Sequence, residues 1–311
     1  MMAVMTPEVP TAITRVGELR QPAAPETTIA TVRPGAQLRG VFACTRKDRL
    51  LTRTGSPYLA VELRDRTGAI QARAFRDADA LAARFERGEL VHAEGRIERF
   101  RDELVMEIER IERAGAEADP SAFLPQAYRD LDELDGFLEH LAGEVYDRQY
   151  TALLSALLGD GELRNQWRRA PCTRAGHHAY LGGLLEHTVA VATLAYELCQ
   201  LHPRLSRDLL LTAAITHDIG RTREFTYGAE IGLTEEGRLL GHLVTGERIL
   251  SARGTMLDER HRLALLHCVL GHHGPGTLPG GRFHSAEAAA LYRLNSLDVA
   301  VKSTFESGLA G

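Results

Sequence analysis

The sequence is poor in cysteine. Its 311 residues include four cysteines (Cys44, Cys172, Cys199 and Cys268), and no two of them form a CxxC pair. This scarcity argues against a disulfide framework and against a zinc knuckle. It predicts that the cysteines are small buried apolar residues in a reducing compartment.

Long apolar runs are also absent. No stretch approaches the ~20 apolar residues of a membrane-spanning helix. Residues 1–25 contain no cationic segment followed by an apolar run, so we expect no secretory signal. With 44% hydrophobic residues, 25% charged residues and a net charge of −5, the composition predicts a soluble cytoplasmic protein without a membrane partner. A homo-oligomer is compatible with the sequence, which does not specify the oligomeric state.

The length predicts two domains, because 311 residues exceed a single core of ordinary size. Residues 1–30 are rich in Ala, Pro and Thr and predict a disordered tail. Residues 31–113 alternate apolar and polar positions in short segments, which predicts strands. These segments are 40–45, 57–65, 69–75, 90–98 and 103–111, with a helical pattern at 78–86. Three strands, a helix and two strands is the order of an OB-fold barrel.

The second half of the chain has a helical period. Residues 114–126 predict a linker, and residues 127–311 predict an all-α bundle. The expected helices include 181–201, 206–219, 234–253, 258–270 and 285–306, most of which open on a capping residue. The predicted fold is therefore an N-terminal all-β OB-fold barrel followed by a C-terminal all-α bundle.

Histidine is concentrated in the predicted bundle, where eleven of the 13 histidines lie between His177 and His284. The pair His217–Asp218 follows His187 by 30 residues and precedes His242 by 25, and His272–His273 lies 30 residues further on. Imidazole and carboxylate bind first-row divalent metals. The set exceeds what one ion can use, so it favours two ions bridged by Asp218 and a water, about 3.5–4 Å apart. The alternative, capping or core histidines, suits a lone histidine better than this set.

These motifs resemble a known family. The strings HHAYLGGLLEHT (177–188), HDIGR (217–221), LLGH (239–242), LGHHG (270–274) and AEAAALYRLNSLD (286–298) are similar to those of HD-domain metal-dependent phosphohydrolases. With an OB-like domain in front, the chain resembles the YhaM-type 3′–5′ exoribonucleases over about residues 31–306. The resemblance implies a divalent cofactor, with manganese expected and iron, cobalt, magnesium or zinc as alternatives. It also implies hydrolysis of single-stranded RNA, or of DNA, from the 3′ end.

The resemblance also implies roles for individual residues. His187, His217 and Asp218 match ligands of a first metal, and His242, His272 and His273 match those of a second, with Asp218 shared. Catalysis is expected from Asp218, His217 and Arg221, where Arg221 would hold a phosphate oxygen in place of the family's common lysine. The last ligand is open between Asn295 and Asp298. His177 and His178 are either orienting or phosphate-binding residues, or exposed loop histidines.

The predicted barrel carries a candidate interface for a single strand. OB folds bind strands between the loop joining strands 1 and 2 and the loop joining strands 4 and 5. The first predicted loop, 46–56, contains Arg46, Lys47, Arg49 and Arg53, and the second contains Arg99, Phe100 and Arg101, with Tyr58 as a further stacking residue. Residues 31–113 have 17 basic and 14 acidic side chains. The alternative is an ordinary solvated face.

The sequence leads to three hypotheses for the function. The leading hypothesis is an exonuclease acting on single-stranded RNA. A second keeps the metals but assigns a small nucleotide or cyclic dinucleotide as substrate. A third is a nucleic-acid-binding regulatory protein whose metal site has decayed at Asn295.

Overall fold

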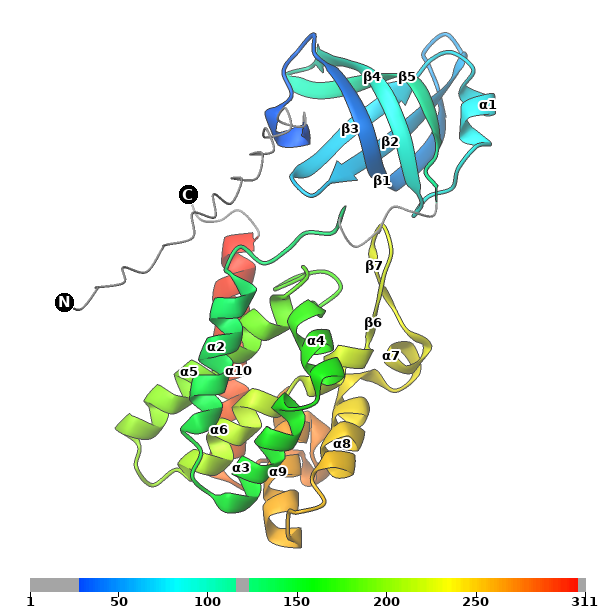
Figure 1. The fold of residues 1–311 in the computed structure, drawn as a ribbon. Coiled ribbons are helices and arrows are strands. Elements are labelled where there is room, and N and C mark those ends of the chain that lie inside the picture. The colour runs from blue at the N-terminus through cyan, green and yellow to red at the C-terminus, as the bar shows by residue number, and fades with distance from the viewer. Residues whose placement is uncertain (1–27, 116–122, 307–311) are drawn as a thin grey trace, which may run out of the picture.

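The structure, a computed structural model, describes residues 28–115 and 123–306, which form a barrel and a helical domain (Figure 1). Most of the predicted tail, residues 1–27, lies outside the described residues. Its last residues do not follow the prediction of disorder, because Ile29–Thr31 forms a short 3-10 helix, η1. Ile29 is buried against the barrel, and its N–H donates to Asp65 Oδ2 at 2.8 Å.

The N-terminal domain is a closed five-stranded barrel with strand order β1-β2-β3-β5-β4. Its elements are β1 (Gln37–Leu51), β2 (Pro57–Asp65), β3 (Gly68–Ala74), α1 (Ala78–Ala82), β4 (Leu90–Phe100) and β5 (Glu103–Arg113). Neighbouring strands are antiparallel except β3 and β5, which close the barrel in parallel. Alternate side chains fill the interior, among them Leu38, Leu59, Leu63, Ile97 and Met106. The predicted OB fold is confirmed.

Two local predictions in the barrel were wrong. Residues 46–51, expected to be loop, continue β1 and pair with β2 down to the partners Leu51 and Pro57. A bulge between Cys44 and Arg46 turns this part of the strand away from the core, so both of its faces are largely exposed and the apolar alternation disappears. The connecting loop is only residues 52–56. The predicted helix 78–86 ends earlier, at Ala82.

The C-terminal domain is predominantly helical. Its helices are α2 (Leu131–Gly143), α3 (Arg148–Leu158), α4 (Gly161–Arg169), α5 (Gly183–Leu201), α6 (Arg207–Thr216), α7 (Glu235–Leu239), α8 (Gly241–Arg253), α9 (Glu259–Gly271) and α10 (Ala286–Glu306). A continuous apolar core joins all of them except α7, and it includes the buried ring of Trp167 and the apolar faces of α5 and α6. The helices of this core hold the histidines in fixed positions.

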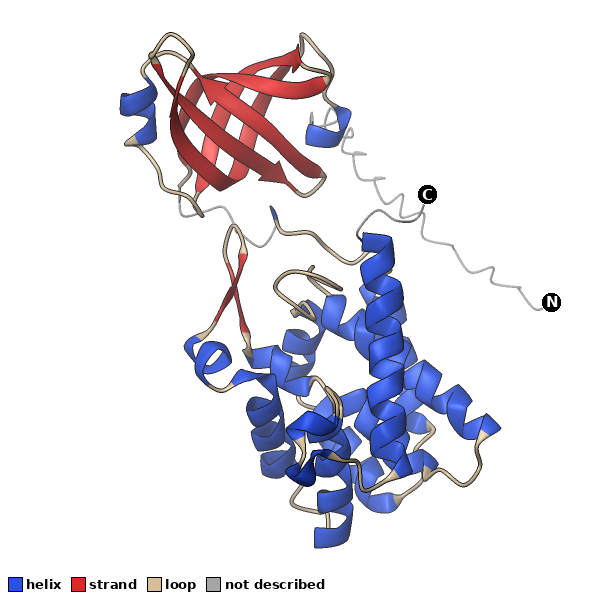
Figure 2. Cartoon of the chain, turned by 180° about the vertical axis from the view of Figure 1, so that it is seen from behind, coloured by secondary structure: helices blue, strands red, loops and turns tan. Residues whose placement is uncertain are grey.

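The prediction of an all-α bundle requires three corrections. A two-stranded hairpin, β6 (Phe225–Tyr227) and β7 (Ile231–Leu233), interrupts the helices, and Figure 2 shows its strands rising toward the barrel. Each strand has three residues, too few to show a period. The expected helix 234–253 is two helices, because Gly241 adopts a φ of 70° that breaks the helical path between α7 and α8. The expected helix 206–219 ends at Thr216, and residues 219–223 form the separate 3-10 helix η3 (Ile219–Arg223).

The hairpin tip joins the two domains. Ala229 is buried against Ala43 of β1 and Leu90 of β4. Beside it, Arg87 Nη2 lies 3.1 Å from Glu230 Oε1. The hairpin tip therefore contacts the barrel through a small apolar cluster, and the exposed ion pair of Arg87 and Glu230 lies beside this cluster.

Candidate metal centre

The ends of α6 and α9 and the buried face of α5 place three histidines around Asp218. α6 ends at Thr216, so His217 is its C-cap and Asp218 leaves the helical conformation with φ −108° and ψ 15°. His272 caps α9 in the same way. The side chains of His187, His217 and His272 have no exposed surface, and Asp218 is 3% exposed. Four of the sequence-predicted ligands, His187, His217, Asp218 and His272, are thus brought into one buried site.

His242 enters the site because η3 and α8 approach closely at a glycine. A Cβ on Gly220 would lie 2.0 Å from the carbonyl oxygen of His242 and 2.6 Å from the N–H of Gly246. Only a residue without a side chain allows this approach. His242 Nε2 then lies 3.4 Å from Asp218 Oδ1, and 2.8 Å from His273 Nε2.

Asp218 lies between two groups of histidines. On one side, Oδ2 is 3.9 Å from His187 Nε2 and 3.7 Å from His217 Nε2. On the other side, Oδ1 is 3.3 Å from His272 Nε2, and His242, His272, His273 and Asp218 have ligand atoms within 4.8 Å of one another. One carboxylate therefore faces two clusters of nitrogen atoms, as a bridging ligand does.

The outer nitrogens of these rings fix their tautomers. His217 Nδ1 donates to Ala214 O at 2.8 Å, and His272 Nδ1 donates to Val269 O at 2.6 Å. His187 Nδ1 donates to Asp298 Oδ2 at 2.6 Å. Each ring in its neutral form then directs a lone pair on Nε2 into the site.

The arrangement of these lone pairs shows whether the site is suited to a metal ion. His187 Nε2 and His217 Nε2 face each other at 3.1 Å, although both rings have already placed their protons elsewhere. Asp218 Oδ1 and His272 Nε2 are buried without a hydrogen-bond partner among the described residues. Buried acceptors that face one another are costly unless a cation lies between them. The donor set therefore fits divalent ions.

Burial and charge set the protonation states. Burial alone would raise the pKa of Asp218, but Arg221, followed by His217, holds it well below the usual value. Burial also lowers the pKa of His217 well below its usual value. An ionised carboxylate beside neutral imidazoles is the protonation state in which these groups bind metal.

Arg221 lies within the site and is 8% exposed. Its Nε is 2.8 Å from Asp218 Oδ2, and its Nη1 donates to Glu224 Oε2 at 3.2 Å. The guanidinium is thus held between two carboxylates, and its expected contact with a phosphate oxygen remains a prediction.

The two candidates for the last ligand occupy different places. Asp298 Oδ2 accepts hydrogen bonds from His187 Nδ1 and, at 3.0 Å, from His178 Nε2. Asn295 is buried, and its Nδ2 donates to His272 O at 3.2 Å. In this arrangement Asp298 orients His187, and Asn295 holds the backbone of His272.

The two loop histidines differ in exposure. His178 is 1% exposed, and its Nδ1 is 2.9 Å from the hydroxyl of Tyr180. A contact of His178 with substrate would require one of its hydrogen bonds to open. His177 is half-buried, and burial, followed by the charge of His187, lowers its pKa to about 4.

Sequence reasoning missed Cys172. Its Sγ donates to Asp218 Oδ2 at 3.5 Å, and the side chain is fully buried. Burial raises the pKa of this thiol well above its usual value. No spacing signal identified it, because two of its neighbours in the site, His187 and Asp218, are 15 and 46 residues away along the chain.

The barrel places its predicted binding residues in three groups. Arg46, Lys47 and Arg49 form ion pairs with Asp48, Glu86 and Asp79 on the same domain. Arg53 and Arg99 are exposed. The remaining predicted residues form an aromatic–arginine strip together with two residues that the sequence did not single out, Arg73 and Phe75. The strip consists of Tyr58, Arg73, Phe75, Phe100 and Arg101.

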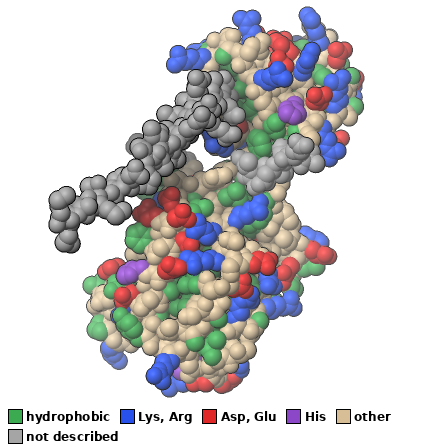
Figure 3. Space-filling model, viewed as in Figure 1, with side chains coloured by type: hydrophobic (Ala, Val, Ile, Leu, Met, Phe, Trp, Pro, Cys, Tyr) green, Lys and Arg blue, Asp and Glu red, His purple; other side chains and the backbone are tan. Residues whose placement is uncertain are grey.

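The strip presents aromatic rings to solvent. Tyr58 and Phe75 stack with ring centroids 5.4 Å apart, and Phe75 is 52% exposed. Arg73 lies 4.6 Å above the ring of Phe100, which is 47% exposed. Exposed rings beside arginine are the groups on which bases stack in single-strand-binding OB folds. Figure 3 shows further basic side chains over this domain, with acidic ones among them.

A cavity of about 460 Å³ opens between the barrel and the helical domain. It is lined by Arg64 of β2, Arg87 and Arg174, and Glu230 is the acidic side chain among its described lining residues. Arg64 and Arg174 have no ion pair within residues 28–115 and 123–306. Arg174 belongs to the loop that also contains Cys172 and His177. One lining residue of the cavity is therefore close in sequence to residues at the metal centre.

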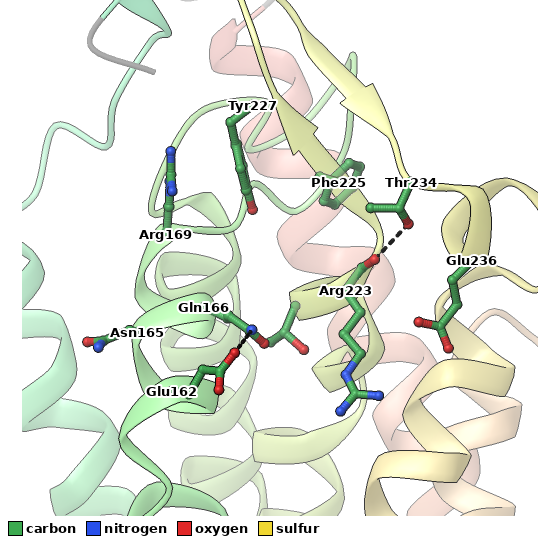
Figure 4. Close-up of a pocket in the computed structure, with 10 residues that line it drawn as sticks. Glu162, Asn165, Gln166, Arg169, Arg223, Phe225, Tyr227, Thr234 and Glu236 are labelled. Atoms are coloured by element: carbon green, nitrogen blue, oxygen red, sulfur yellow. Dashed lines mark hydrogen bonds between the residues drawn. The ribbon is translucent and has the colours of Figure 1, made fainter. Parts of the chain in front are cut away.

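A second cavity of about 560 Å³ is lined by residues of α4, η3, β6 and α7 and is drawn in Figure 4. Arg169 lies 4.4 Å from the ring centre of Tyr227, and Thr234 Oγ1 donates to Arg223 O at 2.8 Å. Two glutamates, Glu162 and Glu236, balance the two arginines that line it. Its charge balance makes it a poorer anion site than the interdomain cavity.

Comparisons with known proteins agree with this architecture. The family model of the HD domain matches residues 184–300, and that of the OB-fold nucleic acid binding domain matches residues 41–114. Three curated relatives are each named 3′–5′ exoribonuclease YhaM. The protein of Shouchella clausii is 26% identical over 278 residues, which cover 86% of this chain and 85% of the relative. That of Listeria monocytogenes serotype 4b is 28% identical over 226 residues, 71% of this chain and 72% of the relative.

The protein of Oceanobacillus iheyensis is 27% identical over 244 residues, 77% of this chain and 76% of the relative. The predicted resemblance to this family is therefore confirmed. None of the helices within residues 28–115 and 123–306 has the length and apolar character needed to cross a membrane.

Proposed function

We propose that this chain, whose residues 184–300 match the HD-domain family model and which is similar to YhaM exoribonucleases over most of its length, is a metal-dependent 3′–5′ exoribonuclease. The observation that carries the proposal is the buried Asp218, whose two oxygens face separate clusters of imidazole nitrogens. A strand-binding fold in the same chain favours a polymeric substrate.

The residues around Asp218 have distinct roles in this proposal. His187 and His217 would hold one ion with Asp218 Oδ2, and His242, His272 and His273 would hold a second with Oδ1. Bound divalent ions supply charge stabilisation at the phosphodiester and a water of lowered pKa. Arg221 keeps Asp218 ionised, and Asp298 keeps the lone pair of His187 directed into the site.

Two features of the structure support binding of a single strand. The aromatic–arginine strip offers stacking surfaces that are independent of sequence. The interdomain cavity offers Arg64 and Arg174 to a phosphodiester backbone between the barrel and the helical domain. We expect the strand to be held by the barrel and its 3′ end to reach Asp218 through this cavity.

The proposal also includes the identity of the metal ion, the type of nucleic acid, the compartment and the oligomeric state. Manganese is the activating ion that we expect, and RNA is the substrate that we expect in preference to DNA. We place the protein in the cytoplasm without a membrane partner, and a homo-oligomer is compatible with its surface.

The test is a time course on single strands that are blocked at the 3′ end or at the 5′ end, with and without manganese. We expect mononucleotides from the 5′-blocked RNA only, and only with the ion present. Asp218→Ala should abolish this release. Glu197→Ala, an exposed acidic position on α5, is the matched control and should be fully active.

The other hypotheses predict different results. Turnover of small nucleotides or cyclic dinucleotides without attack on RNA would replace the proposal by the small-substrate alternative. Metal-free protein at every added concentration of ion, with RNA bound but intact, would replace it by the regulatory alternative.

A further inference from the structure

Cys172 differs from the other cysteines in its surroundings. Cys44 belongs to the apolar core of the barrel, and Cys199 and Cys268 belong to the core of the helical domain. Cys172 is outside these cores and faces polar groups. Its Sγ lies 3.5 Å from Asp218 Oδ2 and 3.7 Å from His177 Nε2. Its backbone N–H donates to His178 O at 3.0 Å, which fixes the thiol at this place.

Two of the distances match the edges of a coordination shell, whereas those from Asp218 Oδ2 to His187 Nε2 (3.9 Å) and to His217 Nε2 (3.7 Å) are longer than the edge of about 3.3 Å that one such ion gives. A thiolate and a carboxylate oxygen on one tetrahedral zinc-sized ion would lie about 3.6 Å apart, and two imidazole nitrogens about 3.3 Å apart, given bond lengths of about 2.3 and 2.05 Å. The observed distances are 3.5 Å from Cys172 to Asp218 and 3.1 Å from His187 to His217. Cys172, His187 and Asp218 offer ligand atoms within 4.8 Å of one another.

An independent observation points to a cation at the same place. The Nδ1 protons of His187 and His217 are donated to Asp298 and Ala214, so two bare Nε2 atoms face each other in a buried site. Neither ring has exposed surface. A thiol that only donated to Asp218 would leave this pair of acceptors unsatisfied.

We propose that Cys172 Sγ is a ligand, as thiolate, of the ion held by His187, His217 and Asp218. The inference rests on the metal centre of the proposed function and makes its two halves chemically different. The half with Cys172 has a soft sulfur ligand and takes zinc, cobalt or iron(II) in preference to manganese or magnesium. The half with His242, His272 and His273 contains only nitrogen and oxygen ligands.

Ligation replaces the S–H bond of Cys172 by a sulfur–metal bond. The thiol proton passes to bulk water, and no oxidant or reductant is required. Loading this half of the centre therefore releases one more proton per chain than loading the same half of a variant without the thiol.

The test uses the full-length protein, stripped with a chelator and titrated with Co²⁺ in the absence of oxygen. Thiolate ligation gives a sulfur-to-cobalt charge-transfer band in the near ultraviolet, which nitrogen and oxygen ligands do not produce. We expect this band in the wild-type protein and in Cys199→Ser, and its loss in Cys172→Ser. We also expect Zn²⁺ affinity to fall at least about 10-fold in Cys172→Ala.

The wild-type spectrum decides the question even if the variants fold poorly. Bound cobalt without the charge-transfer band would overturn the inference, as would a band that persists in Cys172→Ser. The outcome is separable from the proposed function. A sulfur–cobalt band in a protein that leaves RNA intact would refute the nuclease proposal and support Cys172 as a ligand. Manganese-dependent RNA hydrolysis without the band would support the nuclease proposal and refute Cys172 as a ligand.

Discussion

Gly220→Ala isolates the packing that assembles the second half of the metal centre. The added methyl carbon would lie 2.0 Å from His242 O, whereas ordinary contacts begin at 3.4 Å, so α8 must move away from η3 by about 1.4 Å. The movement carries His242 away from Asp218 and widens the cluster with His272 and His273. No ligand is itself replaced.

The expected effect is large on activity and moderate on stability. A misplacement of about 1 Å at a reacting centre costs roughly 100-fold in rate, and overpacking of a close contact costs about 1–3 kcal/mol of unfolding free energy. We expect kcat on a labelled RNA oligonucleotide to fall about 100-fold. Metal analysis should show one of the two ions lost, while the half with His187 and Cys172 is retained.

Gly136→Ala is the matched control. Gly136 lies in α2, and a Cβ there has nothing within 4 Å. The change should leave activity unaltered and stabilise the helix by about 0.5–1 kcal/mol. If Gly220→Ala kept full activity and both ions, the reasoning that close approach of η3 and α8 builds the site would be refuted.

Three further predictions follow from the same geometry. Asp298→Asn removes the carboxylate that fixes His187, so the affinity for the ion on that side should fall about 10–100-fold by metal-competition titration, and an unchanged affinity would count against the orienting role. Phe75→Ala and Phe100→Ala should each weaken binding of single-stranded RNA by about 1–3 kcal/mol in fluorescence anisotropy, and an effect confined to kcat would contradict stacking on the strip. For pH, the folded-state pKa of His177 is about 4 and that of His217 is lowered, against an ordinary 6.5. The unfolded chain therefore binds more protons, and the unfolding free energy of the metal-free protein should decrease as pH falls from 6.5 toward 4, which chemical denaturation at several pH values would measure.

The barrel was predictable from the sequence because alternation at period two records which residues face its core. The same signal failed for residues 46–51, where both faces of the extended β1 are largely exposed. It also failed for the three-residue strands β6 and β7, which are shorter than any period that could reveal them. Their hairpin is nevertheless the element that contacts the barrel through Ala229.

By itself, the sequence determined the chemistry of the centre, because His187, His217, Asp218, His242 and His273 are recognisable as ligand types whatever their positions in space. It could not determine which atoms would meet. Only the packing of α5, α6, α8 and α9 directs the Nε2 atoms inward, closes the gap at Gly220 and brings in Cys172 from a loop. Spacing along a chain records helical faces within one element, but a distance between elements depends on how their cores pack.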